Sequence, residues 1–359
     1  MVGTRPEAIK LAPVAHALAE RGLAPALILT GQHANLDRRD FELGDYPAER
    51  LACPGEVDPH SHVGAVAAAL LPRLADAPDL LVVQGDTSSA LGAALAGFTA
   101  GVPVAHVEAG LRTHDPLLPW PEEEYRTAID AHADLLFAPT ETAAANLRDE
   151  RAPGEIHVTG NSSIDAVLAA EASLPCTTPH AAGAGVVLVT AHRRESWGEG
   201  LASISAALRE LASDATIDFV LHPNAHVAAT MRELLGGIRN IRLLEPCSHR
   251  RLIQRMREAD LVLSDSGGIQ EEAPALGVPL LVLREKTERP EGLACGSATL
   301  VGTSPDRIAA EARRILHDPD ARFDMRRRHF PYGDGKSGPR IAAIIDDWLQ
   351  RRGGTAHSR

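Results

Sequence analysis

The stretch from Leu261 to Pro274 constrains the fold more than any other, and it reads L-V-L-S-D-S-G-G-I-Q-E-E-A-P. Four residues of an apolar strand, Leu261 to Ser264, lead into a polar turn with two glycines, and helical character follows from Ile269 to Leu276. At such a turn, backbone N–H groups and the helix dipole favour an anion, and glycine lets the anion approach closely. The sequence therefore predicts a phosphate seat here, with a plain helix-capping turn as the alternative.

The same order of strand, turn and helix recurs along the chain of 359 residues, a length typical of two domains. Only Met1 and Val2 precede the first turn at Gly3, so we expect a first strand that is barely formed. A Pro/Gly/Ala-rich stretch in the middle of the chain indicates a linker. The later strands are predicted at 26–30, 79–83, 103–107, 134–138 and 156–159 before the linker, and at 186–190, 218–221, 240–244, 261–264 and 279–283 after it.

These patterns predict an α/β protein with two Rossmann-like, doubly wound domains that face a cleft. The ligand is expected at the carboxyl ends of the strands, where the loops of parallel sheets gather. The predicted division is an N-terminal domain at 1–172, a linker at 173–185, a C-terminal domain at 186–335, and a final helix and tail at 336–359.

Composition narrows the class of partner. The formal net charge is −12 without a basic run, which argues against nucleic acid or an anionic membrane surface. The four cysteines stand far apart, so neither a disulfide framework nor a structural zinc site is expected. No leader pattern and no apolar run of the ~20 residues needed to span a bilayer is present, so we expect a cytoplasmic protein.

Two acidic residues follow successive strands of the first half. Asp86 comes after the strand at 79–83, and Glu108 comes directly after the strand at 103–107. Consecutive strands joined by one helix lie parallel, so both carboxylates should emerge at one edge of the sheet. Like charges held close together raise at least one pKa, which supplies an acid and a base from one residue type. The alternative is two ordinary polar residues at strand ends.

Several common motifs are absent. No G-x-G-x-x-G follows a strand, no G-x-x-x-x-G-K-[ST] occurs, and no G-x-S-x-G elbow is present. The segment His60-Ser61-His62 has a spacing that metals use, but no carboxylate or cysteine partner accompanies it, so a helix start is the better interpretation. What remains is a phosphate seat, several cations and a set of carboxylates.

Nine blocks in order resemble the non-hydrolysing UDP-N-acetylglucosamine 2-epimerases, over nearly the whole chain. They are G-T-R-P-E-A-I-K at Gly3, G-D-T at Gly85, H-V-E-A-G-L-R-T at His106, P-W-P-E-E at Pro119, T-G-N at Thr159, H-R-R-E-S at His192, D-S-G-G-I-Q-E-E-A-P at Asp265, T-E-R-P-E at Thr287 and P-Y-G-D-G at Pro331.

The resemblance implies a glycosyltransferase-B-like fold, a homodimer, a role in making cell-surface polysaccharides, and interconversion of UDP-GlcNAc and UDP-ManNAc without a cofactor or metal. The family eliminates UDP across C1–C2 to give 2-acetamidoglucal and then adds UDP back. By position, the acid/base carboxylates correspond to Asp86, Glu108 and Glu122, and His192 corresponds to the histidine that contacts the phosphates. The substrate-binding positions correspond to Arg5, Lys10, Arg126, Ser266, Gly267, Gly268, Glu272 and Arg289, with Ser266 to Gly268 at the pyrophosphate and Glu272 at the ribose.

Other functions compete with this one. A relative acting on a modified UDP-HexNAc, or a hydrolysing enzyme that releases free ManNAc, would share most of these residues. A nucleotide-sugar sensor would need the phosphate seat but no acid/base set. The chain also departs from the family near the uracil, where Cys247 and Leu252 stand in place of a Gln and an aromatic residue.

Overall fold

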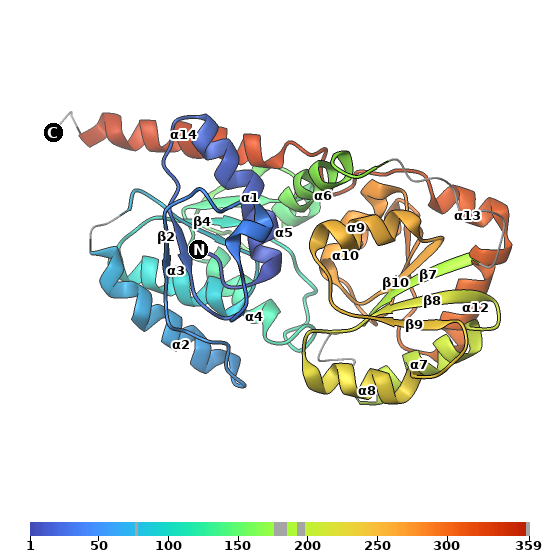
Figure 1. The fold of residues 1–359 in the computed structure, drawn as a ribbon. Coiled ribbons are helices and arrows are strands. Elements are labelled where there is room, and N and C mark those ends of the chain that lie inside the picture. Colours follow the sequence, from blue (N-terminus) through green and yellow to red (C-terminus); the bar gives the residue numbers. More distant parts are fainter. Residues whose placement is uncertain (76–77, 176–184, 192–197, 357–359) are drawn as a thin grey trace. The chain divides into compact units, whose positions relative to one another are not determined.

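The protein is described from a computed structural model, which covers residues 1–75, 78–175, 185–191 and 198–356. The chain divides into two compact units, shown as a ribbon in Figure 1. Unit 1 consists of Met1–Ala166 and Tyr332–Arg359, and unit 2 consists of Val167–Pro331. Each unit is a parallel α/β structure, which confirms the predicted fold class.

Unit 1 is built on a parallel sheet with the strand order β3-β4-β5-β6 and a smaller parallel pair, β1-β2. Its strands are β1 (Leu27–Leu29), β2 (Ala48–Arg50), β3 (Leu81–Gln84), β4 (Val104–Val107), β5 (Leu135–Ala138) and β6 (Glu155–Val158). Its helices are α1 (Arg5–Glu20), η1 (Arg38–Phe41), α2 (Pro59–Leu70), η2 (Leu71–Leu74), α3 (Ser88–Ala100), α4 (Glu122–Asp130), α5 (Glu141–Asp149) and α14 (Ser337–Ala356), while α6 (Ser162–Ala172) crosses the boundary to unit 2.

The expected first strand is reduced to a single bridge. Val2 pairs in parallel with Leu29 of β1, and the Met1 amino group donates to the Val82 carbonyl at 2.9 Å. This short segment therefore lies between β1 and β3 and joins the two sheets of unit 1.

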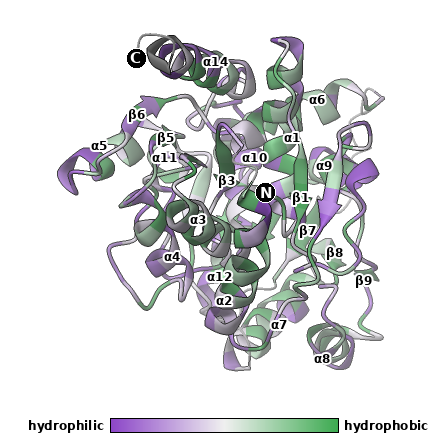
Figure 2. Cartoon of the chain, turned by 90° about the vertical axis from the view of Figure 1, so that its left-hand side faces the viewer, coloured by the Kyte–Doolittle hydropathy of each residue, from purple (hydrophilic) through white to green (hydrophobic). Residues whose placement is uncertain are grey.

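Side chains alternate between two apolar clusters, one on each face of the unit 1 sheet, because successive residues of a strand point to opposite faces. Val104 and Leu136 pack into one cluster with α2, α3, α4 and α5, whereas Ala105 and Leu135 pack into the other with α1 and α14. Figure 2 shows α14 with both hydrophobic and hydrophilic residues, as expected of a helix with one buried face.

Unit 2 is a six-stranded parallel sheet with the order β12-β11-β10-β7-β8-β9. Its strands are β7 (Gly185–Thr190), β8 (Ala215–Val220), β9 (Ile241–Leu244), β10 (Leu261–Ser264), β11 (Leu280–Val282) and β12 (Ala298–Leu300). Its helices are α7 (Glu199–Leu211), α8 (Ala225–Leu235), α9 (His249–Glu258), α10 (Gly267–Leu276), α11 (Pro290–Ala294), α12 (Pro305–His317) and α13 (Pro319–Met325).

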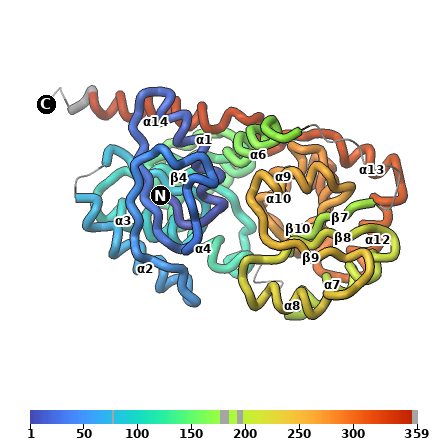
Figure 3. Tube along the Cα trace, viewed as in Figure 1, coloured from blue at the N-terminus to red at the C-terminus, as the bar shows by residue number. Residues whose placement is uncertain are grey.

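The unit boundaries differ from the predicted domains. The first division falls within α6, after Ala166, and not in the predicted linker at 173–185, of which 176–184 lie outside the described residues. The final helix, predicted as a separate segment at 336–359, belongs to unit 1 because Ile341, Ile345 and Trp348 complete a core cluster there. Figure 3 shows the red end of the trace beside the blue α1, and Arg21 Nε donates to Asp346 Oδ2 at 3.0 Å.

Candidate functional site

The two predicted carboxylates do follow neighbouring strands. β3 and β4 pair in parallel, with Gln84 opposite Val107, so Asp86 and Glu108 both lie just beyond the carboxyl edge of the unit 1 sheet. The predicted gathering of acidic loops at this edge is therefore confirmed for these two residues.

Glu108 is a buried carboxylate surrounded by donors. Its Oε1 accepts from Lys10 Nζ at 2.6 Å and from Asn161 Nδ2 at 3.1 Å, and its Oε2 accepts from Gln84 Nε2. Its backbone has φ of 73°, a left-handed conformation that costs free energy for a residue with a Cβ. The loop is thus held in an unfavourable conformation that turns this carboxylate towards Lys10.

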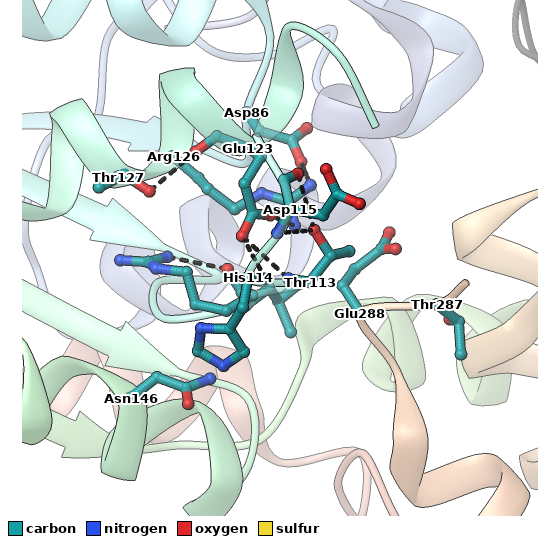
Figure 4. Close-up of polar contacts among 12 residues, drawn as sticks. Asp86, Thr113, His114, Asp115, Glu123, Arg126, Thr127, Asn146, Thr287 and Glu288 are labelled. Carbon is teal, nitrogen blue, oxygen red and sulfur yellow. Dashed lines mark hydrogen bonds and ion pairs between the residues drawn. The ribbon is translucent and has the colours of Figure 1, made fainter. Parts of the chain in front are cut away.

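Asp86 is held from α4. Arg126 Nη2 contacts Asp86 Oδ2, and Arg126 Nη1 lies 3.3 Å from Glu123 Oε2 on the preceding turn of the same helix (Figure 4). Each of the two carboxylates therefore has its own cation, Lys10 for Glu108 and Arg126 for Asp86. The sequence predicted only that the two carboxylates would repel each other. It did not predict that each would form an ion pair with a basic side chain.

Glu123 is a site residue that the sequence did not single out. Its Oε1 accepts from the backbone N–H of Thr113 at 2.9 Å and of His114 at 3.0 Å, contacts that Figure 4 also shows. Glu123 therefore fixes the loop after β4 to α4, while its neighbour Glu122 begins the helix and is half-buried. The spacing of three residues between Glu123 and Arg126 is the signal that identifies this face of the helix.

Arg5 and Lys10 lie on α1, whose start is well capped. Thr4 and Glu7 form a capping box, and Glu7 also accepts from Thr87 Oγ1 at 2.6 Å, next to Asp86. The Arg5 N–H donates to His33 Nδ1 at 3.3 Å. Burial and the charge of Arg5 lower the pKa of His33, which keeps its ring neutral and able to accept this hydrogen bond.

The phosphate seat predicted at Ser266 to Gly268 is the N-terminus of α10 in unit 2. The Ser266 N–H donates to Ser264 Oγ at 3.0 Å, and the Ser266 side chain makes no capping hydrogen bond to the helix. A Cβ on Gly267 would lie 2.9 Å from the Arg289 guanidinium, whereas a Cβ on Gly268 would have no neighbour closer than 3.9 Å. Gly267 therefore packs against Arg289, and Gly268 borders open space.

Arg289 is buried among carboxylates below this turn. Its Nε donates to Glu271 Oε1 at 2.6 Å, and its Nη1 contacts Glu288, which also pairs with Arg284 at 3.0 Å. The next acidic residue, Glu272, has a different partner, because His249 Nε2 of α9 lies 2.8 Å from Glu272 Oε1. Of the predicted residues, Ser266, Gly267 and Gly268 therefore form the start of α10, Glu272 lies further along the same helix, and Arg289 packs against Gly267.

His192, predicted to contact the phosphates, lies outside the described residues. Within the part of the chain that the structure describes, no group of three or more His, Cys, Asp or Glu side chains is arranged to hold a metal ion. In the same residues, no helix has both the length and the apolar character required to cross a membrane.

Comparison with known proteins identifies the family. A family model described as UDP-N-acetylglucosamine 2-epimerase matches residues 16–346. The chain belongs to this family. The UDP-N-acetylglucosamine 2-epimerase of Salmonella typhimurium is 42% identical over 367 residues, which cover 96% of this chain and 97% of the relative.

Solved structures of epimerases from this family have the same fold. The UDP-GlcNAc 2-epimerase from Neisseria meningitidis bound to UDP-GlcNAc is 36% identical, with a TM-score of 0.88 and coverage of 98% of both chains. The Methanocaldococcus jannaschii UDP-GlcNAc 2-epimerase in complex with UDP-GlcNAc and UDP is 32% identical, with a TM-score of 0.84 and coverage of 96% of this chain and 98% of that one. The chain is accordingly a UDP-N-acetylglucosamine 2-epimerase.

Proposed function

We propose that this epimerase interconverts UDP-GlcNAc and UDP-ManNAc by elimination and re-addition of UDP. A carboxylate removes the proton from C2, the C1–O bond breaks, and UDP leaves with the bonding electrons to give 2-acetamidoglucal. UDP oxygen then attacks C1 while an acid delivers a proton to the other face of C2. The sequence is redox-neutral, so no redox cofactor is required.

Proton handling on both faces of the sugar needs more than one acid/base group. We assign it to Asp86, Glu108 and Glu122 of unit 1. The observation that carries this assignment is that Asp86 and Glu108 follow neighbouring parallel strands, each with its own cation. Lys10 pairs with Glu108 and Arg126 pairs with Asp86, so each carboxylate has a cation beside it.

The nucleotide is assigned to unit 2 and to the start of α1. Ser266, Gly267 and Gly268 offer the helix N-terminus to the pyrophosphate, which is favoured by the exposed N–H groups and the helix dipole. Glu272 accepts from the ribose, and Arg289 is a further contact of the active site. Arg5 and His192 contact the phosphates, His192 assisting the departure and return of UDP.

The test is NMR of the purified protein with UDP-GlcNAc in D2O. Deuterium at C2 together with UDP-ManNAc supports the proposal. Free ManNAc with UDP identifies a hydrolysing enzyme, and the absence of both exchange and product identifies a nucleotide-sugar sensor. A parallel run with a modified UDP-HexNAc compares kcat/KM and identifies the preferred sugar.

We also propose that the epimerase is a homodimer, as the family resemblance implies. Analytical ultracentrifugation should give twice the mass of one chain at micromolar concentration. A monomer that turns over at the full rate would contradict this.

A further inference from the structure

A buried histidine and aspartate lie behind the two carboxylates at the edge of the unit 1 sheet. His106, in the middle of β4, is completely buried, and so is Asp130 at the end of α4. His106 Nδ1 lies 2.6 Å from Asp130 Oδ1, and His106 Nε2 lies 2.8 Å from the carbonyl oxygen of Gly85. Each ring nitrogen thus faces an oxygen.

The carbonyl of Gly85 defines one ring nitrogen of His106 that carries hydrogen. A carbonyl oxygen only accepts, so Nε2 donates to Gly85. Burial alone would raise the pKa of Asp130, but the charges and hydrogen bonds of His106 and Arg112 lower it below its ordinary value. His106 Nδ1 faces Asp130 Oδ1, so the ring is held between the Gly85 carbonyl and this carboxyl group.

The charged side chains next to the His106 ring form ion pairs with one another. Arg112 Nη2 lies 2.8 Å from Asp130 Oδ2, and the same guanidinium pairs with Glu150 at 2.6 Å. Asp130 thus lies between the His106 ring of β4 and the Arg112 guanidinium from the loop that follows it. The ion pairs of Arg112 with Asp130 and with Glu150 extend this buried cluster to Glu150.

His106 and Asp130 form hydrogen bonds with both loops that carry the acid/base residues. His106 holds the carbonyl of Gly85, the residue before Asp86. Asp130 Oδ2 accepts from the N–H of Gly110 at 3.0 Å, two residues after Glu108. Gly110 has φ of 83°, and a Cβ there would lie 2.2 Å from the Ala143 carbonyl, so only glycine fits at this turn.

We propose that His106 and Asp130 are positioning residues that hold Asp86 and Glu108 in fixed positions relative to each other. This inference rests on the proposed function, because it assigns the pair a purpose through those two carboxylates. Neither member belongs to the acid/base set; both act through the backbone of the Gly85 and Gly110 turns.

An apolar pair of similar size would fill the same space, since buried ion pairs are often no more stabilising than hydrophobic replacements. What an apolar pair cannot do is hold the Gly85 carbonyl and the Gly110 N–H. A misplacement of about 1 Å at a reacting group costs about 10²-fold in rate. The pair therefore affects kcat, while the proposed pyrophosphate contacts of Ser266 to Gly268 lie in unit 2.

The test compares Asp130→Asn and His106→Asn with the matched control Asp134→Asn. Asp134 Oδ2 also accepts a backbone N–H, from Val104 at 2.9 Å, but at the opposite end of β4. We expect kcat for both site variants to fall about 10²-fold, with KM for UDP-GlcNAc and Kd for UDP within about twofold of wild type. The control should retain kcat. Folded site variants with wild-type kcat, or an equal loss in the control, would overturn the proposal.

A second measurement on the wild-type protein applies even if the variants do not fold. Long-range ¹H–¹⁵N correlation of the histidine side chains should show hydrogen on Nε2 of His106, as the contact with the Gly85 carbonyl requires, and a ring with hydrogen on Nδ1 alone would overturn the proposal. The wild-type turnover assay in D2O tests the proposed function separately. Loss of that function would leave this spectrum unchanged.

Discussion

Lys10 Nζ lies 2.6 Å from Glu108 Oε1, and the two side chains are only 8% and 6% exposed. A buried ion pair of this kind is costly to break, because the remaining charge has neither water nor a counter-ion around it. Lys10 is one of three lysines in a chain with 36 Lys and Arg residues, and its position beside Glu108 explains why a basic residue is required there.

Lys10→Met should lower the free energy of unfolding by about 3–5 kcal/mol and abolish turnover. Urea unfolding followed by circular dichroism measures the free energy of unfolding, and the assay with UDP-GlcNAc measures turnover. Arg21→Met is the control, since the partly exposed Arg21–Asp346 pair is worth only about 0–1 kcal/mol. The double variant Lys10→Met/Glu108→Gln should recover stability but not activity. Wild-type stability in the single variant would contradict the argument.

Asp86→Asn should lower kcat by at least about 10²-fold, the usual contribution of a general acid or base. Affinity for UDP should change little, because Arg126 keeps its contact with Glu123 and the phosphate seat is in unit 2. Initial rates and calorimetric titration with UDP measure the two effects. Asp149→Asn, an exposed carboxylate of the same unit, should behave as wild type. Full activity in Asp86→Asn would remove this residue from the mechanism.

Glu123→Gln should lower kcat about 10-fold to 100-fold, because the amide loses the charge that holds Arg126, although its oxygen can still accept the backbone hydrogen bonds from Thr113 and His114. Glu124→Gln provides the control, since Glu124 is the next residue of α4 and is exposed. Steady-state kinetics on both variants checks the prediction. Equal rates for the two would show that the contacts of Glu123 matter only for folding.

Gly268→Asp should weaken UDP binding at least about tenfold, or ~1.4 kcal/mol, because it places a negative charge at the proposed phosphate seat. Folding should be little affected, since a Cβ there has no neighbour closer than 3.9 Å. Gly64→Asp adds the same charge to an exposed position of α2 with nothing within 4 Å, and should leave affinity unchanged. Unaltered affinity in Gly268→Asp would disprove the anion seat.

Asp130 and Asp165 should give opposite dependences of stability on pH. The pKa of Asp130 is lowered, so the unfolded chain binds its proton more tightly, and the stability that Asp130 contributes is lost as pH falls through the folded-state pKa. Burial raises the pKa of Asp165 despite its hydrogen bonds from Gly338 and Ser337, so its contribution falls as pH rises above the ordinary value of 3.8.

The measurement is the free energy of unfolding between about pH 2 and 6 for wild type, Asp130→Asn and Asp165→Asn, the range around an ordinary carboxyl pKa. The deficit of Asp130→Asn relative to wild type should grow with pH, and that of Asp165→Asn should shrink. Parallel curves for the two variants would contradict the assigned shifts.

The sequence predicted most strands of both sheets because their apolar runs are short and bounded by turns. It missed β2 because all three of its residues, Ala48 to Arg50, are exposed and show no apolar pattern. It also missed β12, which has three residues at the edge of a sheet. Strands of this kind form because a neighbouring strand offers backbone hydrogen-bond partners. The residues of the short strand itself do not show that such a neighbour is present.

The position of Asp86 and Glu108 at one edge followed from the rule that parallel strands end together. Their partners did not, because Lys10 and Arg126 come from α1 and α4, and side-chain contacts between distant elements leave no local pattern. The triplet Glu122 to Glu124 shows the same limit. Its acidic character was evident, but which member faces inward depends on how α4 packs.

The last helix, α14, has a consequence for synthesis on the ribosome. Ile341, Ile345 and Trp348 belong to the core that α1 and β5 also line, so unit 1 lacks part of its interior until α14 has been synthesised. Unit 2 is continuous from Val167 to Pro331 and has all its strands earlier. Domains usually fold in the order of their synthesis. Here unit 2 is synthesised after the start of unit 1 but can fold before it. The reason is that α1 packs with α14, which lies more than three hundred residues later in the chain.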